Sequence, residues 1–327
     1  MRFKGSTTAI VLTSNLIVHP AWAQGSPAFE KHLEKTFSAA VILMDSDVVT
    51  FGIHDFDPNE WFNLENEQIG SDESLSLRKQ ITVSTLPITF ELSEEGATHK
   101  HFLVTRLAAF VSEQNVEVLG TEFSDQQKDT VLSGYVAYRY QYQITENWSL
   151  TPSLGTHLMY YKNDFDYKSD FFNSIKPAID GVLVNTNAWA NIYEPSIKLK
   201  YHKDKDWGSW NVNSTWHYFY GYGWGEANHG DVGNPEGWYI ANEVTAKYNF
   251  DRWGRAVQSV YSSLRRIDLG ADTADPFGTH YYYEAAVGWL MTPPFESEWI
   301  ENIGIGLNFN YGSALKGGSI VLFFNQD

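Results

Sequence analysis

Apolar and polar residues alternate along much of the chain, and the alternation is most regular between Leu132 and Tyr160. Apolar side chains recur at every second position from Leu132 to Ile144, with polar residues such as Arg139 between them. After the polar turn 145–147 the same pattern resumes through Tyr160. A period of two is typical of a β-strand with one apolar face. The segment therefore predicts a β-hairpin whose strands are about twice as long as the usual five or six residues.

The alternation continues to the end of the chain and predicts about twelve strands in all. It is clear over 189–201, 210–224, 238–250, 280–289 and 303–311, and weaker over 48–56, 75–92, 101–111, 256–269 and 319–324. Within 75–92 the apolar residues are odd-numbered before Pro87 and even-numbered after it. A β-bulge at Leu86 and Pro87 would explain this change of phase.

Composition favours a membrane β-barrel over a soluble sandwich. Aromatic residues make up 16% of the chain, yet hydrophobic content is only 43%. A spanning strand of roughly 9 to 11 residues shows lipid only every second side chain, so mean hydropathy stays low. Aromatic residues also gather near strand ends, as at Trp148, Tyr160 and Trp224, where membrane interfaces favour them. We therefore expect an all-β fold, a transmembrane antiparallel up-and-down β-barrel.

The connections between the predicted strands alternate in length. Short turns lie around Glu94, Glu146, Asp204, Arg252 and Phe295, and longer connections are 57–73, 112–129, 162–186, 225–236, 271–278 and 312–317. Short turns of such barrels face the periplasm, and long loops face outward. An even number of strands then predicts that both termini lie in the periplasm.

The first 23 residues have the pattern of a signal peptide. Arg2 and Lys4 precede an apolar stretch over 9–18, and an Ala-Trp-Ala triplet ends at Ala23. We expect cleavage after Ala23, leaving Gln24 first in the mature chain. An uncleaved anchor is the weaker interpretation, because the apolar stretch is about half the length of a spanning helix.

Residues 24–47 form an N-terminal segment ahead of the predicted barrel domain, 48–327. Phe29, Leu33 and Phe37 recur every four residues, which predicts a short amphipathic helix over 26–40 that would plug the lumen. The alternative is that 37–44 extends the first strand.

Charge and motifs exclude several function classes. The formal charge of −17 argues against nucleic acid as a partner. The chain has no cysteine, so no disulfide is expected, and we expect no metal or other cofactor. HExxH, GxSxG and the His-x-Ser-Asn-Gly motif of outer-membrane phospholipases are absent from the sequence, so we expect no enzyme activity. His99 with His101, and the loop 226–231, could bind a cation, but a solvated strand end and turn chemistry explain them more simply.

The charged residues on the predicted inner face are the candidate functional residues. A charge facing lipid near the bilayer midplane costs about 2 to 4 kcal/mol, which assigns these side chains to the lumen. They are predicted to line a pore: Arg139, Glu194, Lys198, Lys200, Glu243, Lys247 and Glu284. Opposed charges would either create a transverse field in a narrow pore or pair to fill a closed barrel.

The layout resembles the solitary outer-membrane autotransporter-like β-barrel family. The resemblance covers nearly all of the mature chain and rests on the strand layout, on the hairpin YVAYRYQYQITENWSLTPSLG at 135–155 and on the terminal GSIVLFF at 318–324. It implies twelve strands with a helix in the pore. Autotransporters export a large passenger, whereas about two dozen residues separate Gln24 from Val48, so no passenger is expected. The terminal aromatic Phe324 is followed by three further residues, which offsets the usual assembly signal.

Two functions follow from this layout. The resemblance implies an autotransporter-like barrel without a passenger, in a structural or narrow-pore role in the outer membrane. Its expected partners are outer-membrane lipid and lipopolysaccharide and the barrel assembly machinery. The alternative is a porin-like selective channel for small solutes or cations, with acidic residues in the first outer loop attracting cations: Asp57, Glu60, Glu65, Glu67, Asp72 and Glu73.

Overall fold

The structure is a computed structural model, and it describes residues 25–45, 52–94, 96–117, 124–295 and 300–326. These residues form one antiparallel sheet of twelve strands in the order β1-β12-β11-β10-β9-β8-β7-β6-β5-β4-β3-β2. The predicted all-β, up-and-down architecture is confirmed. In the described part of the chain, no helix has both the length and the apolar character needed to cross a membrane.

The strands differ in length around the sheet. They are β1 (His54–Phe56), β2 (Ile81–Glu91), β3 (His99–Val116), β4 (Asp125–Gln143), β5 (Trp148–Asp166), β6 (Asn187–Lys205), β7 (Gly208–Gly225), β8 (Glu236–Trp253), β9 (Ala256–Ala271), β10 (Tyr281–Met291), β11 (Ile303–Tyr311) and β12 (Gly317–Phe324). Strands β3 to β8 have 18 or 19 residues, whereas β10 to β12 have 11, 9 and 8. One side of the wall is therefore longer than the roughly 9 to 11 residues that cross a bilayer.

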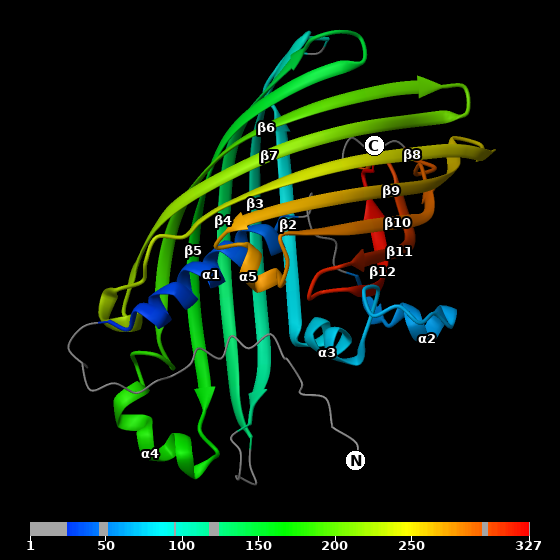
Figure 1. The fold of residues 1–327 in the computed structure, drawn as a ribbon. Coiled ribbons are helices and arrows are strands. Elements are labelled where there is room, and N and C mark those ends of the chain that lie inside the picture. Colours follow the sequence, from blue (N-terminus) through cyan, green and yellow to red (C-terminus); the bar gives the residue numbers. More distant parts are fainter. Residues whose placement is uncertain (1–24, 46–51, 95, 118–123, 296–299, 327) are drawn as a thin grey trace.

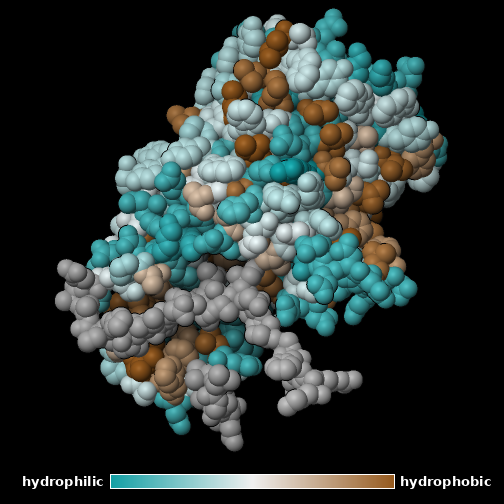
Figure 2. Space-filling view, in the orientation of Figure 1, coloured by the Kyte–Doolittle hydropathy of each residue, from teal (hydrophilic) through white to brown (hydrophobic). Residues whose placement is uncertain are grey.

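The helices lie inside the sheet or in the long connections (Figure 1). They are α1 (Pro27–Leu43), α2 (Pro58–Phe62), α3 (Asp72–Gln80), α4 (Asp170–Ile179), α5 (Ala274–Phe277) and the 3-10 turn η1 (Ala227–Gly230). Figure 2 shows hydrophilic side chains over α2 and α3, at the lower right of the view. We call the end of the sheet with these connections the long-loop end, and the opposite end the short-turn end.

The hairpin β4–β5 confirms the predicted faces. Leu132, Val136 and Tyr138 are exposed on the outside, whereas Ser133 and Ala137 are buried on the inside. Strand β12 follows the same rule, because Val321 and Phe323 point inward while Leu322 and Phe324 are exposed. The outer surface of the strands is thus apolar, as a lipid-facing surface requires.

The predicted plug helix is present and lies against the concave face of the sheet (Figure 1). Pro27 occupies the first turn, where its missing N–H costs no hydrogen bond. The helix continues to Leu43, so the alternative that 37–44 extends the first strand is wrong. Every residue from Thr36 to Met44 is buried. A helix that is buried on all sides needs apolar residues all round, and Ala39 to Leu43 supply them.

The segment 75–92 is not one strand. Its first part is helix α3, and β2 begins at Ile81. The β2–β3 register is continuous from Ile81 to Glu91, so the predicted bulge at Leu86 and Pro87 is wrong. The change of phase has another cause: Ile81 and Val83 pack inward against the core, whereas Leu86, Ile88, Phe90 and Leu92 are exposed on the outer face.

The first and last strands join through hydrogen bonds. His54 to Phe56 of β1 pair with Ile320 to Gly318 of β12. In the described ranges β1 and β2 are the two edges of the sheet and do not pair, so hydrogen bonds do not close the cylinder there. Of the predicted strand 48–56, residues 48–51 lie outside the described residues.

Helix α3 spans this seam through one buried arginine. The Arg78 guanidinium is 2.7 Å from Asp55 Oδ1 of β1 and donates to the Leu315 carbonyl at 2.7 Å. It also donates to the Ser319 hydroxyl of β12. A planar five-donor group suits a site where several acceptors converge.

The prediction that both termini lie at the short-turn end fails for the N-terminal side. Ser26 bonds to Asn228 in η1, so α1 starts at the long-loop end and runs inward. The reason is that α1 occupies the lumen, and strand number alone cannot place a segment ahead of the first strand. The predicted signal peptide, 1–23, lies outside the described residues.

Candidate functional site

The interior of the sheet holds the candidate site, and α1 bounds this site on the side of the long-loop end. Leu33, Phe37 and Ile42 of α1 have no exposed surface and pack with inward residues of the wall: Phe110, Val131, Met159, Ala188, Ala190, Ile192, Phe219 and Tyr239. Burying one such large apolar side chain contributes about 1.5 to 3 kcal/mol. The long-loop half of the lumen is therefore filled by an apolar core.

The start of α1 is fixed to the long connections by polar contacts. The Asn228 side chain accepts from the Ser26 N–H at 2.6 Å and donates to the Ser26 carbonyl at 3.1 Å. Glu34 Oε1 accepts from the backbone N–H of Asn234 at 2.8 Å. Asn228 adopts a positive φ of 55°, a conformation that asparagine tolerates better than most residues. The loop 226–231 thus holds the helix, and turn chemistry explains its composition.

Two lysines of α1 add ion pairs at this end. Lys31 pairs with Asp272, and Lys35 Nζ is 2.7 Å from Asp275 Oδ2. The hydrogen bond from Lys35 lowers the pKa of Asp275, and its charge adds to the effect. Asp272 and Asp275 lie in the connection between β9 and β10. This connection and η1 therefore both bind the same helix.

A buried polar cluster lies where α1 ends, and we call it the central cluster: Asp45, Arg106, His157, Glu194, His217 and Tyr239. Asp45 follows α1 directly, and each of the others comes from a different strand, β3, β5, β6, β7 and β8. Glu194, His157 and Tyr239 are at most 1% exposed. The cluster therefore links the end of α1 to five strands of the wall.

Glu194 is at the centre of these contacts. Its Oε2 is 2.5 Å from His157 Nε2, and its Oε1 is 2.5 Å from His217 Nδ1. The Tyr239 hydroxyl is 2.8 Å from Glu194 Oε1 and 3.0 Å from Asp45 Oδ2. Arg106 Nη1 is 2.9 Å from Asp45 Oδ1. Buried charges need such partners, because desolvation of an unpaired charge costs several kcal/mol.

Glu243 and Glu284 lie in a second network that runs across three strands. Arg265 of β9 is the register partner of both glutamates. Its Nη2 is 2.7 Å from Glu243 Oε1, and its Nη1 is 3.5 Å from Glu284 Oε2. These two predicted pore residues are thus on the inner face, in ion pairs with an arginine that the sequence analysis did not single out.

The four predicted cations occupy the short-turn half of the lumen. Arg139, Lys198, Lys200 and Lys247 are half-buried and share the inward register of their strands. In the β5–β6 register, Lys198 lies opposite Thr151 and Lys200 lies opposite Ser149. The structure therefore separates the seven predicted residues: Glu194 is in the central cluster, the other two glutamates pair with Arg265, and the cations lie nearer the short turns.

The sequence analysis missed most of the central cluster. Alternation did place His157 and His217 on the inner face, but nothing in the pattern showed that both meet Glu194. That step needs the strand register, in which Gly155 is opposite Glu194 and Ser196 is opposite His217. Asp45 gave no signal, because it precedes the first strand and is positioned only by the docking of α1.

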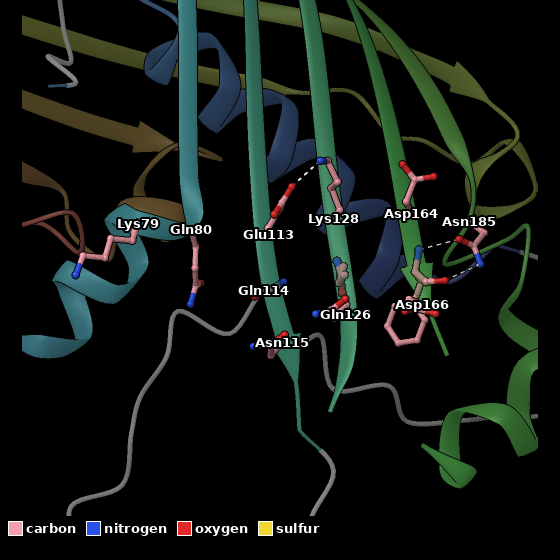
Figure 3. A pocket seen from close by; sticks show the side chains of 12 residues that line it. Lys79, Gln80, Glu113, Gln114, Asn115, Gln126, Lys128, Asp164, Asp166 and Asn185 are labelled. Atoms are coloured by element: carbon pink, nitrogen blue, oxygen red, sulfur yellow. Dashed lines mark hydrogen bonds and ion pairs between the residues drawn. The ribbon is translucent and has the colours of Figure 1, made fainter. Parts of the chain in front are cut away.

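A polar pocket of about 670 Å³ lies at the long-loop end of β3 to β5, beside α3 (Figure 3). Figure 3 shows Glu113 and Lys128 pointing toward one another, and their side chains form an ion pair of 2.5 Å. The Asn185 side chain accepts from the backbone N–H of Phe165 at 2.7 Å. The pocket lining is rich in amides and carboxylates and also includes Lys79 and Lys128.

The predicted pair His99 and His101 lies on the outer face of β3, beside aromatic residues. The His99 ring stacks on Tyr142 at 4.8 Å between centroids, and His101 Nδ1 is 2.5 Å from the Tyr138 hydroxyl. Tyrosine near the short turns is expected where strands leave the bilayer. The geometry thus favours an interfacial aromatic group over a shared metal.

Comparison with known proteins agrees with this architecture. The model of the solitary outer membrane autotransporter β-barrel domain matches residues 34–326, nearly the whole chain. Searches of curated proteins and of solved structures found no match. The match includes most of α1, all of the central cluster and all twelve strands. This chain therefore belongs to the solitary outer membrane autotransporter β-barrel domain family, and it is located in the outer membrane.

Proposed function

We propose that the protein is a self-plugged outer-membrane barrel with a structural role, whose resting state is closed by α1. The observation that supports this most is the complete burial of residues Thr36 to Met44, the second half of α1 and its C-cap, inside the sheet. Polar contacts hold the helix at both ends, at Ser26 by the loop η1 and at Asp45 by Arg106. A helix fixed at both ends and surrounded by side chains blocks passage through that half of the lumen.

Thiol accessibility tests the closed state directly. The chain has no cysteine, so a single introduced thiol is the only one. Ser38→Cys places it at a fully buried position of α1, and Ala28→Cys places a control on the exposed first turn of the same helix. In a plugged barrel a polar maleimide labels the control quickly and Ser38→Cys slowly. Equal labelling rates would contradict the plug.

Bilayer conductance tests the consequence. The full chain is expected to show little steady conductance, and deletion of 26–44 is expected to increase it. If both proteins conduct equally, α1 does not close the path, and the structural role fails.

The second candidate function is a narrow anion-preferring channel that opens when α1 moves. The half-buried cations Arg139, Lys198, Lys200 and Lys247 favour it. The inner-face glutamates Glu243 and Glu284 are paired with Arg265, and an excess of one sign of charge in a pore selects the opposite ion. This differs from the cation preference expected from the acidic outer loop. The reversal potential of the deletion variant in a salt gradient distinguishes the two: anion preference supports the lumen cations, and cation preference supports the loop.

We propose no catalytic role for the barrel. Lipase and protease assays on the refolded protein, with Glu194→Gln as the matched variant, test this. Turnover that is lost in the variant would contradict it.

A further inference from the structure

The outer surface of the sheet is hollowed over β6, β7 and β8, and we call this hollow the outer groove. Its volume is about 430 Å³, within the roughly 300 to 1,000 Å³ of sites that bind small molecules. The inward residues Ser196 and His217 also border it, so the groove reaches the wall between β6 and β7. Its outward side chains are apolar or aromatic: Pro195, Ile197, Trp216, Tyr218, Trp238 and Ile240.

The ladder between β6 and β7 is interrupted at this groove. Tyr193 lies opposite Tyr220 and Ser196 opposite His217, but positions 194 and 195 have no register partner on β7, although both strands are described in full there. Odd-numbered residues of β6 turn their backbone polar groups towards β7, as the carbonyl at position 187 does. Pro195 is odd-numbered and has no N–H to donate. A proline in the middle of the wall therefore opens the ladder where the groove lies.

A glycine on β9 keeps the groove from being filled by its own side wall. Gly270 is the register partner of Trp238, and a Cβ at Gly270 would lie 2.2 Å from Trp238 Cε2. The indole thus lies over the bare backbone of β9. It borders the groove on that side and leaves the space above Pro195 open.

The surroundings of the groove are hydrocarbon. Leu154 of β5, the register partner of Pro195, is exposed on the same outer face, and so is Trp216. The outer face of such a barrel lies against lipid. An empty hollow loses dispersion contacts with its surroundings, and an acyl chain restores them.

The end of the groove towards the long loops carries a negative charge. The Tyr218 hydroxyl donates to Glu236 Oε1 at 2.8 Å, and Glu236 is exposed at the start of β8. Tyrosine and Trp238 at this level mark the edge of the hydrocarbon layer. On the neighbouring strand, Arg266 is already bound to Asp268. The groove therefore opens beside a carboxylate, which attracts an ammonium headgroup and repels a headgroup that carries only phosphate.

We infer that the outer groove binds one acyl chain of a phosphatidylethanolamine molecule, whose ammonium group contacts Glu236. This inference goes beyond the proposed plug, because α1 lies on the other face of the wall. The two also fail separately: the plug is measured by conductance and by labelling at position 38, and the lipid site by cross-linking on the outer face.

The test is photo-cross-linking of the refolded full chain in phosphatidylethanolamine vesicles. A small share of the lipid carries a diazirine in the middle of one acyl chain, and the labelled peptides are mapped by mass spectrometry. Labelling is expected to be several-fold higher at Pro195, Trp216 and Ile240 than at Val136 and Tyr138 of β4, which are exposed on the same face. Even labelling over the outer face would overturn the inference.

Ile240→Trp tests the groove by filling it. The larger side chain should reduce labelling of β6 and β7 at the groove to the level found on β4. Leu264→Trp is the matched control, because Leu264 is exposed on the outer face of β9 and does not line the groove. Equal loss in the two variants would contradict a specific site. The label distribution on the wild-type chain decides the question if a variant does not fold.

A second copy of the chain is the competing occupant. Ile240→Cys carries the only thiol, and mild oxidation in the same vesicles should leave it monomeric if lipid fills the groove. A disulfide-linked dimer together with weak lipid labelling would contradict the lipid site.

The headgroup is tested by competition. Unlabelled phosphatidylethanolamine should displace the photoreactive lipid better than lipopolysaccharide does. Glu236→Gln should reduce the advantage by up to about fivefold, the ratio that an exposed ion pair provides. Glu113→Gln, at an exposed carboxylate of β3, is the control and should leave it unchanged. Better displacement by lipopolysaccharide would contradict the assignment of the lipid.

Discussion

The two halves of the lumen are lined by different kinds of side chain, although the same strands form both halves. On β6 the inward residues are Ala188, Ala190 and Ile192 towards the long loops, and Ser196, Lys198 and Lys200 towards the short turns, with Glu194 between the two groups. Strand β4 changes in the same way, from Val131 and Ala137 to Arg139 and Gln141. On β6 the inner face is therefore apolar only as far as α1 reaches, and Glu194 of the central cluster marks the boundary.

The largest expected effect is on the free energy of unfolding, for a substitution in the central cluster. Arg106→Met leaves two buried carboxylates without their cation, and removing one partner of a buried ion pair costs about 3 to 5 kcal/mol. Urea unfolding followed by tryptophan fluorescence measures it. Lys100→Met is the control, because the Lys100–Glu91 pair is exposed and contributes at most about 1 kcal/mol. Equal effects of the two changes would mean that the boundary adds nothing to stability.

A smaller effect is expected within the apolar half. Leu33→Ala removes a fully buried side chain from α1 and should cost about 2 to 5 kcal/mol through lost burial and a cavity. It should also raise the conductance, because the helix packs less tightly. Leu154→Ala, on the exposed outer face, is the control for conductance. A closed, fully stable Leu33→Ala protein would show that packing does not hold α1 in place.

Substitutions in the polar half of the lumen should change ion selectivity and leave the free energy of unfolding unchanged. In the variant that lacks 26–44, Lys198→Glu should shift the reversal potential in a potassium chloride gradient towards cation preference. Lys162→Glu changes an exposed lysine on the outer face near the rim and should leave it unchanged. If both variants give the same shift, Lys198 does not line the ion path.

The smallest effect is at the long-loop end of α1. Asp275→Asn removes the pair with Lys35, and since the Asp275 side chain is 70% exposed the loss should be at the low end of about 0.2 to 1 kcal/mol. The pKa of Asp275 is held below its ordinary value of 3.8 by the Lys35 hydrogen bond. Its contribution is therefore full above that value and disappears as the pH falls through the lowered pKa. The labelling rate of Ser38→Cys should differ between the chain with Asp275 and the chain with Asp275→Asn near neutral pH, and the two rates should converge in acid.

Alternation predicted the wall well, because side-chain direction in a strand depends only on position. It placed Arg139, Lys198 and Glu243 inward and Tyr138 outward, and it found α1 from Phe29, Leu33 and Phe37. It could not show which inward residues meet, because contacts between His157, Glu194 and His217 depend on register across three strands. It also misread 75–92, where helix α3 and two differently buried parts of β2 produced an apparent shift of phase.

The change from apolar to charged residues along the inner face of β6 is visible in the sequence. A run such as Ala188, Ala190 and Ile192 on a face that later holds Lys198 indicates that something apolar fills one end of the lumen. This pattern would have predicted the depth of the plug from the strands alone, without reference to the helix.

The pairing of β1 with β12 bears on how the protein reaches its native state. Residues near 54 must meet residues near 320, so the contacts that join the two ends of the sheet form only after the last strand exists. Contacts between residues far apart in the sequence slow folding. Until they form, unpaired strand edges can bind wrong partners. The N-terminal strand β1 must therefore remain unpaired until the C-terminal strands have been synthesised and exported.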